Sequence, residues 1–227
     1  GCVFCATGKE GFARNLTVGE IIQQILIVQK DFDKRVTNLV GMGQGEPFLN
    51  YDAVIGALDI INSKKGLNIG ARKITLSTCG IIKGIKRFST VAEQYTLAIS
   101  LHAARQELRD KIMPHVASNT LKQLKAALID YLKVTNRRVT LEYTLIDGLN
   151  DSDEDLDALL SFMNGMLCHV NLIRLNSIPD SPFQPSSQTT MSHWKETIEG
   201  AGVECTIRIS NGADIFGACG MLKNARS

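Results

Sequence analysis

The fold is decided by the stretch Thr37-Asn-Leu-Val-Gly-Met-Gly-Gln-Gly-Glu-Pro47, in which a short apolar run ends in a glycine-rich loop. Apolar residues then recur at helical spacing over 51–64, so this region predicts a strand, a loop and a helix. The same order recurs along the chain. Strands that alternate with helices favour right-handed crossovers and a parallel sheet.

The recurring pattern extends on both sides of this stretch. It predicts strands over 37–41, 73–77, 96–101, 138–146, 169–175 and 204–209. It predicts helices over 18–32, 51–64, 153–165 and 192–201. The capping pair Thr17 and Glu20 opens the first of these, and the capping pair Thr120 and Gln123 opens a further helix. The even spread of apolar residues indicates one domain over 1–227. We therefore expect an α/β fold, built as a partial parallel (β/α) barrel.

Composition sets limits on function. The chain has 227 residues, with 25 Lys plus Arg against 23 Asp plus Glu, so its overall charge gives no argument for a polyanionic partner. Any contact with RNA must come from local patches. No apolar run is long enough to cross a bilayer, and the first residues lack the order of a signal peptide. We expect a cytoplasmic protein with no membrane partner.

Polar and glycine-rich residues follow four predicted strands at the point where each strand ends. They are Gly45 and Glu46, Ser77, Ser100 to His102, and Asn176. In a parallel barrel the carboxyl ends of the strands lie at one face, and the loops there form the active site. Each residue alone is more typical of a turn or a helix cap. Their coincidence at four strand ends predicts one shared site.

Cysteine spacing indicates metal or redox chemistry. Thiolates at the Cys2-x-x-Cys5 spacing ligate one metal ion or neighbouring irons of a cluster. The spacing alone leaves a redox pair and half of a zinc site open as alternatives. We expect Cys168 and Cys205 to be ordinary strand residues, and the pattern assigns no role to Cys79.

The residues around these cysteines narrow the alternatives. Cys2-Val-Phe-Cys5-Ala-Thr-Gly8 and Gly11-Phe-Ala-Arg-Asn-Leu-Thr17 resemble the cluster-binding loop of the RlmN and Cfr family of radical S-adenosylmethionine (SAM) RNA methyltransferases. The resemblance extends over essentially the whole chain. It implies a 4Fe-4S cluster, with Cys2 and Cys5 as the second and third of three cysteine ligands and one iron open for SAM. The first ligand, the first barrel strand and an N-terminal accessory domain would lie outside this chain.

The resemblance also assigns roles to the polar strand ends. Gly45-Glu46-Pro47 is similar to the family's Gly-Glu-Pro motif, whose carboxylate and backbone hold the methionine amino group of SAM. A dinucleotide-binding loop would need a third glycine where Glu46 stands. By resemblance, the SAM-binding residues are Gly45, Glu46, Ser77, Ser100, Leu101, His102 and Asn176. Gln44 departs from the Met that the family usually has, which bears on substrate fit.

A further motif lies at 214–222. Its sequence Asp214-Ile-Phe-Gly-Ala-Cys-Gly-Met-Leu222 resembles the family's Asp-Ile-x-Ala-Ala-Cys-Gly-Gln-Leu, which makes Cys219 the methyl carrier and the catalytic residue. In the family this thiol takes a methyl group from one SAM, and a radical made from a second SAM activates that methyl for addition to adenine. A cysteine upstream of the cluster then forms a disulfide as the product leaves. The small apolar surroundings alone would also suit a buried, inert thiol.

The resemblance implies a function. We expect methylation of C2 of an adenosine in 23S rRNA of the large subunit, with transfer RNA as a second substrate of some members. An external electron donor would reduce the cluster. C8 methylation of the rRNA adenosine, as in Cfr, is the close alternative. A non-catalytic cysteine-rich or zinc-binding module and a radical SAM enzyme of other outcome are further alternatives, although the Cys219 motif argues against the last.

Overall fold

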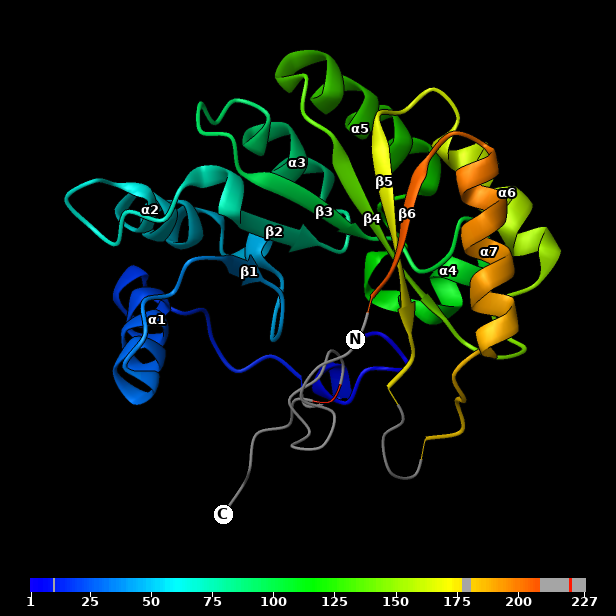
Figure 1. The fold of residues 1–227 in the computed structure, drawn as a ribbon, viewed down its shortest axis with the longest axis horizontal. Coiled ribbons are helices and arrows are strands. Elements are labelled where there is room, and N and C mark those ends of the chain that lie inside the picture. Colours follow the sequence, from blue (N-terminus) through cyan, green and yellow to red (C-terminus); the bar gives the residue numbers. More distant parts are fainter. Residues whose placement is uncertain (10, 177–180, 209–220, 222–227) are drawn as a thin grey trace.

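The computed structural model describes residues 1–9, 11–176, 181–208 and 221. Its centre is a curved sheet with helices around its outer side (Figure 1). The strands are β1 (Leu39–Gly41), β2 (Ile74–Thr78), β3 (Thr96–Ser100), β4 (Val139–Leu145), β5 (Cys168–Arg174) and β6 (Glu204–Arg208). The α-helices are α1 (Val18–Phe32), α2 (Tyr51–Asn62), α3 (Ile82–Phe88), α4 (Gln106–Ile112), α5 (Leu121–Thr135), α6 (Asp153–Met163) and α7 (Gln188–Gly200). Short 3-10 turns are η1 (Thr7–Lys9), η2 (Pro47–Leu49), η3 (Ala71–Lys73) and η4 (Pro114–Val116).

The strands stand in the sheet in their chain order, and every neighbouring pair is parallel. Among the described residues β1 and β6 are the two outer strands, so the sheet is not closed. This arrangement confirms the predicted α/β fold and partial parallel barrel. Because all strands run the same way, their carboxyl ends lie at one edge, where a site can draw on several loops.

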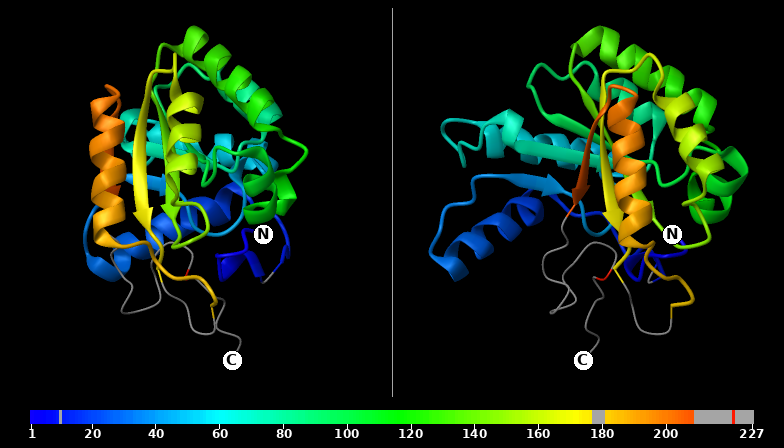
Figure 2. Two further views of the ribbon diagram at one scale, coloured as in Figure 1. Left: turned by 90° about the vertical axis from the view of Figure 1, so that its right-hand side faces the viewer. Right: turned by 45° about the vertical axis from the view of Figure 1, so that its right-hand side comes forward.

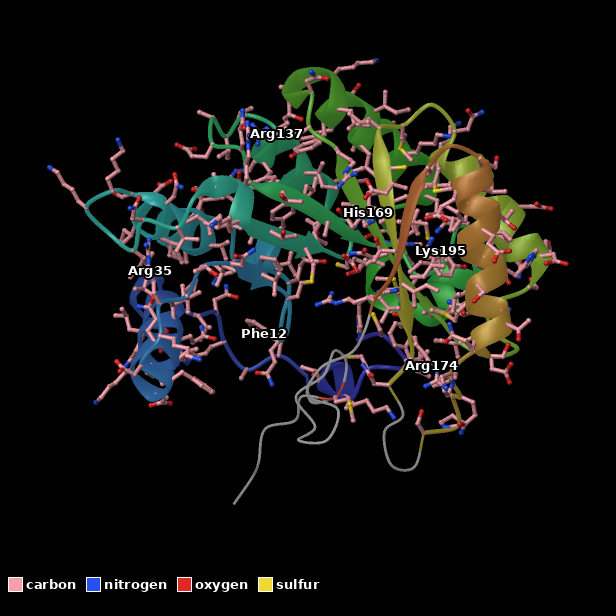
Figure 3. The ribbon with its side chains drawn as sticks, in the orientation of Figure 1. Phe12, Arg35, Arg137, His169, Arg174 and Lys195 are labelled. Atoms are coloured by element: carbon pink, nitrogen blue, oxygen red, sulfur yellow. The ribbon has the colours of Figure 1, made fainter. Side chains whose placement is uncertain are left out.

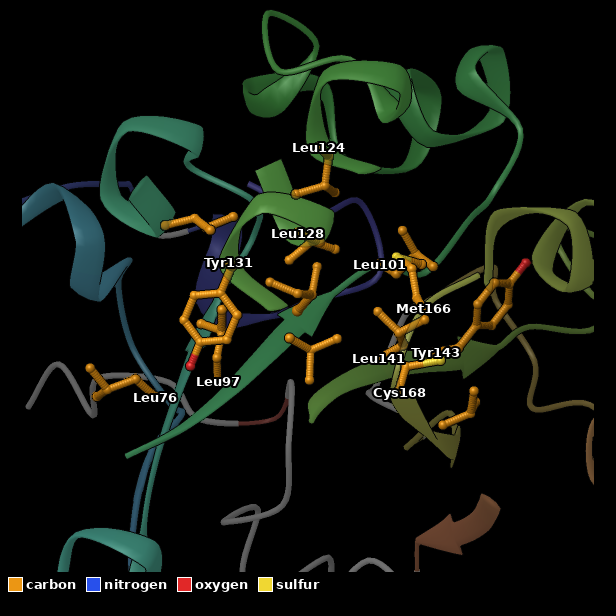
Figure 4. Close-up of a cluster of buried hydrophobic side chains, with 14 of the residues drawn as sticks. Leu76, Leu97, Leu101, Leu124, Leu128, Tyr131, Leu141, Tyr143, Met166 and Cys168 are labelled. Atoms are coloured by element: carbon orange, nitrogen blue, oxygen red, sulfur yellow. The ribbon is translucent and has the colours of Figure 1, made fainter. Parts of the chain in front are cut away.

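The main core fills the space between the sheet and the helices (Figure 4). Leu97 and Leu141 on neighbouring strands and Leu128 and Tyr131 on α5 are almost completely buried. Only alternate strand residues reach this layer, because successive side chains point to opposite faces of a sheet. Each buried Leu contributes roughly 2 kcal/mol relative to an exposed one. The opposite face of the strands is therefore left for the polar residues of the site.

Two helices begin with the capping boxes that the sequence predicts. Thr17 and Glu20 cap α1, and Thr120 and Gln123 cap α5, with each side chain accepting the other residue's backbone N–H. A box of this kind satisfies two of the N–H groups that a helix start leaves unpaired. Arg14 pairs with Glu20 at 2.6 Å and strengthens the first box.

Three helices differ from the prediction. The sequence pattern predicts no helix over 82–88 or 106–112, where α3 and α4 lie. Helices of seven residues are too short to show apolar periodicity, and they depend on packing against other elements. In α3, for example, Gly84 packs so closely that an added Cβ would stand 2.5 Å from the Cβ of Phe48. The pattern starts the last helix at 192, whereas α7 begins at Gln188 because Ser187 Oγ accepts the Thr190 N–H as an N-cap.

The longest helices, α1 and α5, have 15 residues each. In the part of the chain that the structure describes, no helix has the length and apolar character needed to span a membrane.

Candidate functional site

The cysteine loop lies at the carboxyl edge of the sheet. Figures 1 and 2 place the chain near the N label at the same end of the sheet as the arrowheads of β4 and β5. The Val3 N–H donates to the Ile112 carbonyl at the end of α4, and the Cys5 N–H donates to the Cys2 carbonyl at 3.1 Å. Phe4 is buried in a second apolar cluster that includes Ile112. Both thiols of the Cys2-x-x-Cys5 pair are half-buried and belong to one tight turn seated on α4.

The Glu46 carboxylate joins the ends of β1 and β2. One oxygen accepts the Phe48 N–H at 3.0 Å, which caps η2, and the other accepts the Cys79 N–H at 2.7 Å. Gly45 has a φ of 87°, a left-handed value that glycine adopts without strain. A carboxylate has about four lone-pair positions, so Glu46 is held in place and retains acceptor capacity for an ammonium group.

The two predicted serines face each other across neighbouring strands. Ser77 Oγ lies 3.2 Å from Ser100 Oγ, near the ends of β2 and β3. Leu101 follows directly; its side chain is completely buried, and its N–H donates to the Glu142 carbonyl at 3.0 Å. The serines therefore offer two hydroxyl groups at one point, while Leu101 anchors the end of β3 to β4.

His102 connects the cysteine loop to β4. Its φ is 54°, a left-handed conformation that costs a non-glycine residue on the order of 1–3 kcal/mol. Asn150 Nδ2 stabilises it by donating to the His102 carbonyl at 2.7 Å. His102 Nδ1 accepts the Thr144 N–H at 3.1 Å, and Phe4 meets the ring edge-on with centroids 5.2 Å apart. The ring is thus a packed, hydrogen-bonded support of the site.

The environment of His102 predicts how stability depends on pH. Burial lowers the pKa of His102 from 6.5 to about 3, with Arg109 acting in the same direction. The folded protein keeps the ring neutral while the unfolded chain protonates it below pH 6.5, so this stability is present above pH 6.5 and is lost as the pH falls towards 3. When the pH is lowered from 7.5 to 5, we expect the free energy of unfolding of the wild type to fall by about 2 kcal/mol more than that of His102→Gln.

Urea unfolding of both proteins at the two pH values measures this difference. The matched control is His193→Gln, because the His193 side chain is 56% exposed whereas the His102 ring is buried. Equal losses for the wild type and His102→Gln would contradict a neutral, buried ring.

Two further residues at this edge have no role in the sequence analysis. Cys79 follows β2, and burial, then Glu46, raises the pKa of its thiol. Arg109 on α4 is completely buried, and its Nη2 donates to the Cys79 carbonyl at 2.6 Å. Arg109 lies in a helix too short to show apolar periodicity, so the sequence gives no sign that its side chain is buried.

The structure brings together part of the predicted site. The carboxyl edge of the sheet holds Cys2, Cys5, Gly45, Glu46, Ser77, Ser100, Leu101 and His102, and Asn176 follows β5. Cys219 lies outside the described residues. Within 1–9, 11–176, 181–208 and 221, no three His, Cys, Asp or Glu side chains form a group that could hold a metal ion. No disulfide joins the cysteines of this described part, so the family's disulfide stays a prediction.

Sequence comparison finds relatives over nearly the whole chain. A family model described as the radical SAM superfamily matches residues 1–160. A probable dual-specificity RNA methyltransferase RlmN of Clostridium novyi (strain NT) is 48% identical over 98% of this chain, and one of Alkaliphilus metalliredigens (strain QYMF) is 45% identical over 98%. This chain spans 65% and 63% of the lengths of those two proteins. The resemblance to RlmN seen in the motifs is thereby confirmed.

Solved structures share the fold. A radical SAM methyltransferase from Sphaerobacter thermophilus superposes with a TM-score of 0.94 at 42% identity, covering 98% of this chain and 66% of that one. Streptococcus suis SuiB bound to S-adenosylmethionine gives a TM-score of 0.67 at 14% identity, covering 92% and 48%. The second likeness concerns the fold alone.

Proposed function

Because this chain belongs to the radical SAM superfamily, we propose that it is the catalytic part of an RNA methyltransferase of the RlmN type. The observation that carries the proposal is that the Cys2-x-x-Cys5 turn, Glu46 and the Ser77–Ser100 pair all lie at one edge of the sheet. The 48% identity to a probable RlmN supports the same reaction class. The proposal places the enzyme in the cytoplasm with its RNA, and an external donor supplies the electron.

The described residues fit the cofactors of this superfamily, a 4Fe-4S cluster and SAM. The Cys2 and Cys5 thiolates would bind two of the irons, and Arg109 Nη1, buried and without a hydrogen-bond partner, suits an anionic group nearby. When bound there, the cluster would provide one-electron reduction of SAM. Glu46, with Gly45, would accept the ammonium group of SAM.

The remaining polar groups would orient SAM. In this proposal the Ser77 and Ser100 hydroxyls hold its ribose and carboxylate, and Asn176 contacts its adenosyl group. The end of β3 at Leu101 and His102 contributes through its fixed backbone. Because burial keeps His102 neutral, its ring holds position rather than transferring a proton.

Cys219 carries the methyl group in this proposal. A C–H carbon of adenine is too weak a nucleophile to attack SAM, whereas a thiolate readily attacks the methyl carbon of a sulfonium and displaces the thioether. The Cys219 thiolate would take the methyl group of one SAM, with S-adenosylhomocysteine as the leaving group. A radical made from a second SAM would then remove a hydrogen atom from this methyl group, so that its carbon can add to the adenine ring. A second cysteine, upstream of the cluster, would release the product by forming a disulfide with Cys219.

The RNA substrate would approach the carboxyl edge of the sheet. Figure 3 shows Arg174 and Phe12 on the side of the molecule where the cysteine loop lies. Arg174 is exposed, and Phe12 is 80% exposed. A guanidinium pairs with phosphate, and an exposed aromatic ring stacks on unpaired bases. We propose C2 of an adenosine in 23S rRNA as the acceptor, with transfer RNA as a second substrate.

Mass spectrometry of digested RNA tests this function. We expect 2-methyladenosine in 23S rRNA and transfer RNA from cells that carry the gene, and its loss when the gene is deleted. 8-Methyladenosine in its place would assign the Cfr-like reaction instead. If neither nucleoside depends on the gene, RNA methylation is refuted, and zinc in place of iron and sulfide after anaerobic purification would indicate the binding-module alternative.

A further inference from the structure

Arg109 is an arginine buried beneath the cysteine loop. Its side chain is completely shielded from solvent. Nη2 donates to the Cys79 carbonyl at 2.6 Å and Nε donates to the Leu101 carbonyl at 3.3 Å. The residue therefore bridges the loops that follow β2 and β3. Its third nitrogen, Nη1, is buried and has no hydrogen-bond partner within 1–9, 11–176, 181–208 and 221.

Among the residues that the structure describes, the charge of Arg109 has no carboxylate partner. None of the ion pairs in the described part of the chain includes it. The adjacent Asp110 accepts from Gln106 Nε2 at 2.7 Å instead. Burying a cation without a counter-charge is strongly unfavourable, so buried charges are found paired or beside metal centres. A nearby anion is therefore expected.

The surroundings of Arg109 indicate where this anion belongs. The cysteine loop is seated on the same helix, because the Val3 N–H donates to the Ile112 carbonyl at 3.0 Å. Burial lowers the pKa of Arg109, while the Cys79 and Cys2 thiols, followed by Asp110, act in the opposite direction. Both thiols thus lie within electrostatic range of the guanidinium. Cysteine thiolates that bind a cluster bring negative charge to this place.

We propose that Arg109 is a positioning residue whose positive charge balances the iron–sulfur cluster bound at the Cys2-x-x-Cys5 turn and makes that cluster easier to reduce. This inference rests on the proposed function, since it requires the cluster. Reduction adds one electron to an already anionic site, and a fixed cation in a poorly solvated place favours the added charge. The two carbonyl contacts hold the guanidinium in place, and Nη1 remains for the cluster or its thiolates.

An anaerobic redox titration of the full-length holoenzyme, followed by electron paramagnetic resonance, tests the inference. Arg109→Gln removes the charge, and we expect it to shift the reduction equilibrium at least tenfold against the reduced cluster. For a one-electron step this corresponds to a reduction potential about 59 mV more negative. Arg109→Lys keeps the charge but loses the planar fork. It should stay within about threefold of the wild type, even if it unfolds at a lower temperature.

Arg105→Gln is the matched control. Arg105 precedes α4, and its guanidinium pairs with Glu154 at 2.9 Å and Asp155 at 2.7 Å, so its charge is already balanced. We expect it to leave the potential unchanged. An unshifted Arg109→Gln, or an Arg109→Lys shifted as far as Arg109→Gln, would overturn the inference and leave Arg109 a purely structural bridge. A wild-type protein without iron and sulfide would refute the proposed function itself.

If Arg109→Gln fails to fold, Arg109→Met takes its place as the neutral variant. A charge role predicts a shift of at least tenfold against reduction in Arg109→Met and a potential within about threefold of the wild type in Arg109→Lys; equal potentials in these two variants would overturn the inference.

Discussion

Replacing Cys5 with Ala should remove iron and sulfide from the anaerobically purified protein and lower SAM cleavage by more than about 100-fold. The Cys5 N–H closes a turn on the Cys2 carbonyl, and buried Phe4 fixes the same turn against α4. The backbone of the turn therefore survives the substitution, and only a thiolate ligand is lost. Iron and sulfide assays measure the result.

Cys168→Ala is the matched control for Cys5→Ala. Cys168 is buried in β5, and burial raises the pKa of its thiol to about 11, so it is an unreactive core residue. We expect a loss of on the order of 1 kcal/mol of stability from the small cavity and no loss of iron. A Cys5→Ala protein that retains a full complement of iron would contradict the assignment of this turn to the cluster.

Replacing Cys219 with Ala should abolish methyl transfer to RNA while SAM cleavage continues. The expectation follows from the chemistry of the carrier, because no other nucleophile in the proposed reaction accepts the first methyl group. We expect methyladenosine to fall below about 1% of the wild-type amount, a loss of at least two orders of magnitude. Mass spectrometry of the RNA and chromatography of released deoxyadenosine measure the two steps separately.

Cys205→Ala provides the control for Cys219→Ala. Cys205 is 3% exposed in β6, and burial raises the pKa of its thiol to about 12. Methylation should persist in this variant. Methyladenosine at wild-type levels in Cys219→Ala would remove this thiol from the reaction and favour direct attachment of the methyl group by another route.

Local patterns predict the sheet, because each strand carries its own signal. The runs that predict strands overlap all six observed strands, and the glycine-rich loop after β1 marks the first site residue. Helices α3 and α4 escape prediction since their stability comes from contacts distant in the chain. Gly84, for example, is explained only by Phe48, which lies against it.

The chemistry of the site is predicted less completely than the fold. Glu46 can be assigned from its motif, but the motif does not say that its carboxylate holds the Cys79 N–H. Likewise, Arg109 is one of several charged residues in a polar segment of the sequence, and only the fold brings its guanidinium to the carbonyl groups of Cys79 and Leu101. Pairings between side chains and distant backbone atoms depend on the tertiary fold and leave no periodic trace in the sequence.

The strands also lie in the order in which a ribosome would deliver them. Each strand then meets its neighbour soon after synthesis, and the sheet can grow from one side as the chain emerges. The cysteine turn, in contrast, contacts residues that are synthesised much later than the turn itself. Cys2 and Cys5 are synthesised before the elements that shelter them, because His102, Ile112 and Asn150 come about a hundred residues later or more. Cotranslational folding therefore leaves both thiols open to oxygen and to stray metal ions until most of the domain is complete, and cluster loading belongs to the end of synthesis.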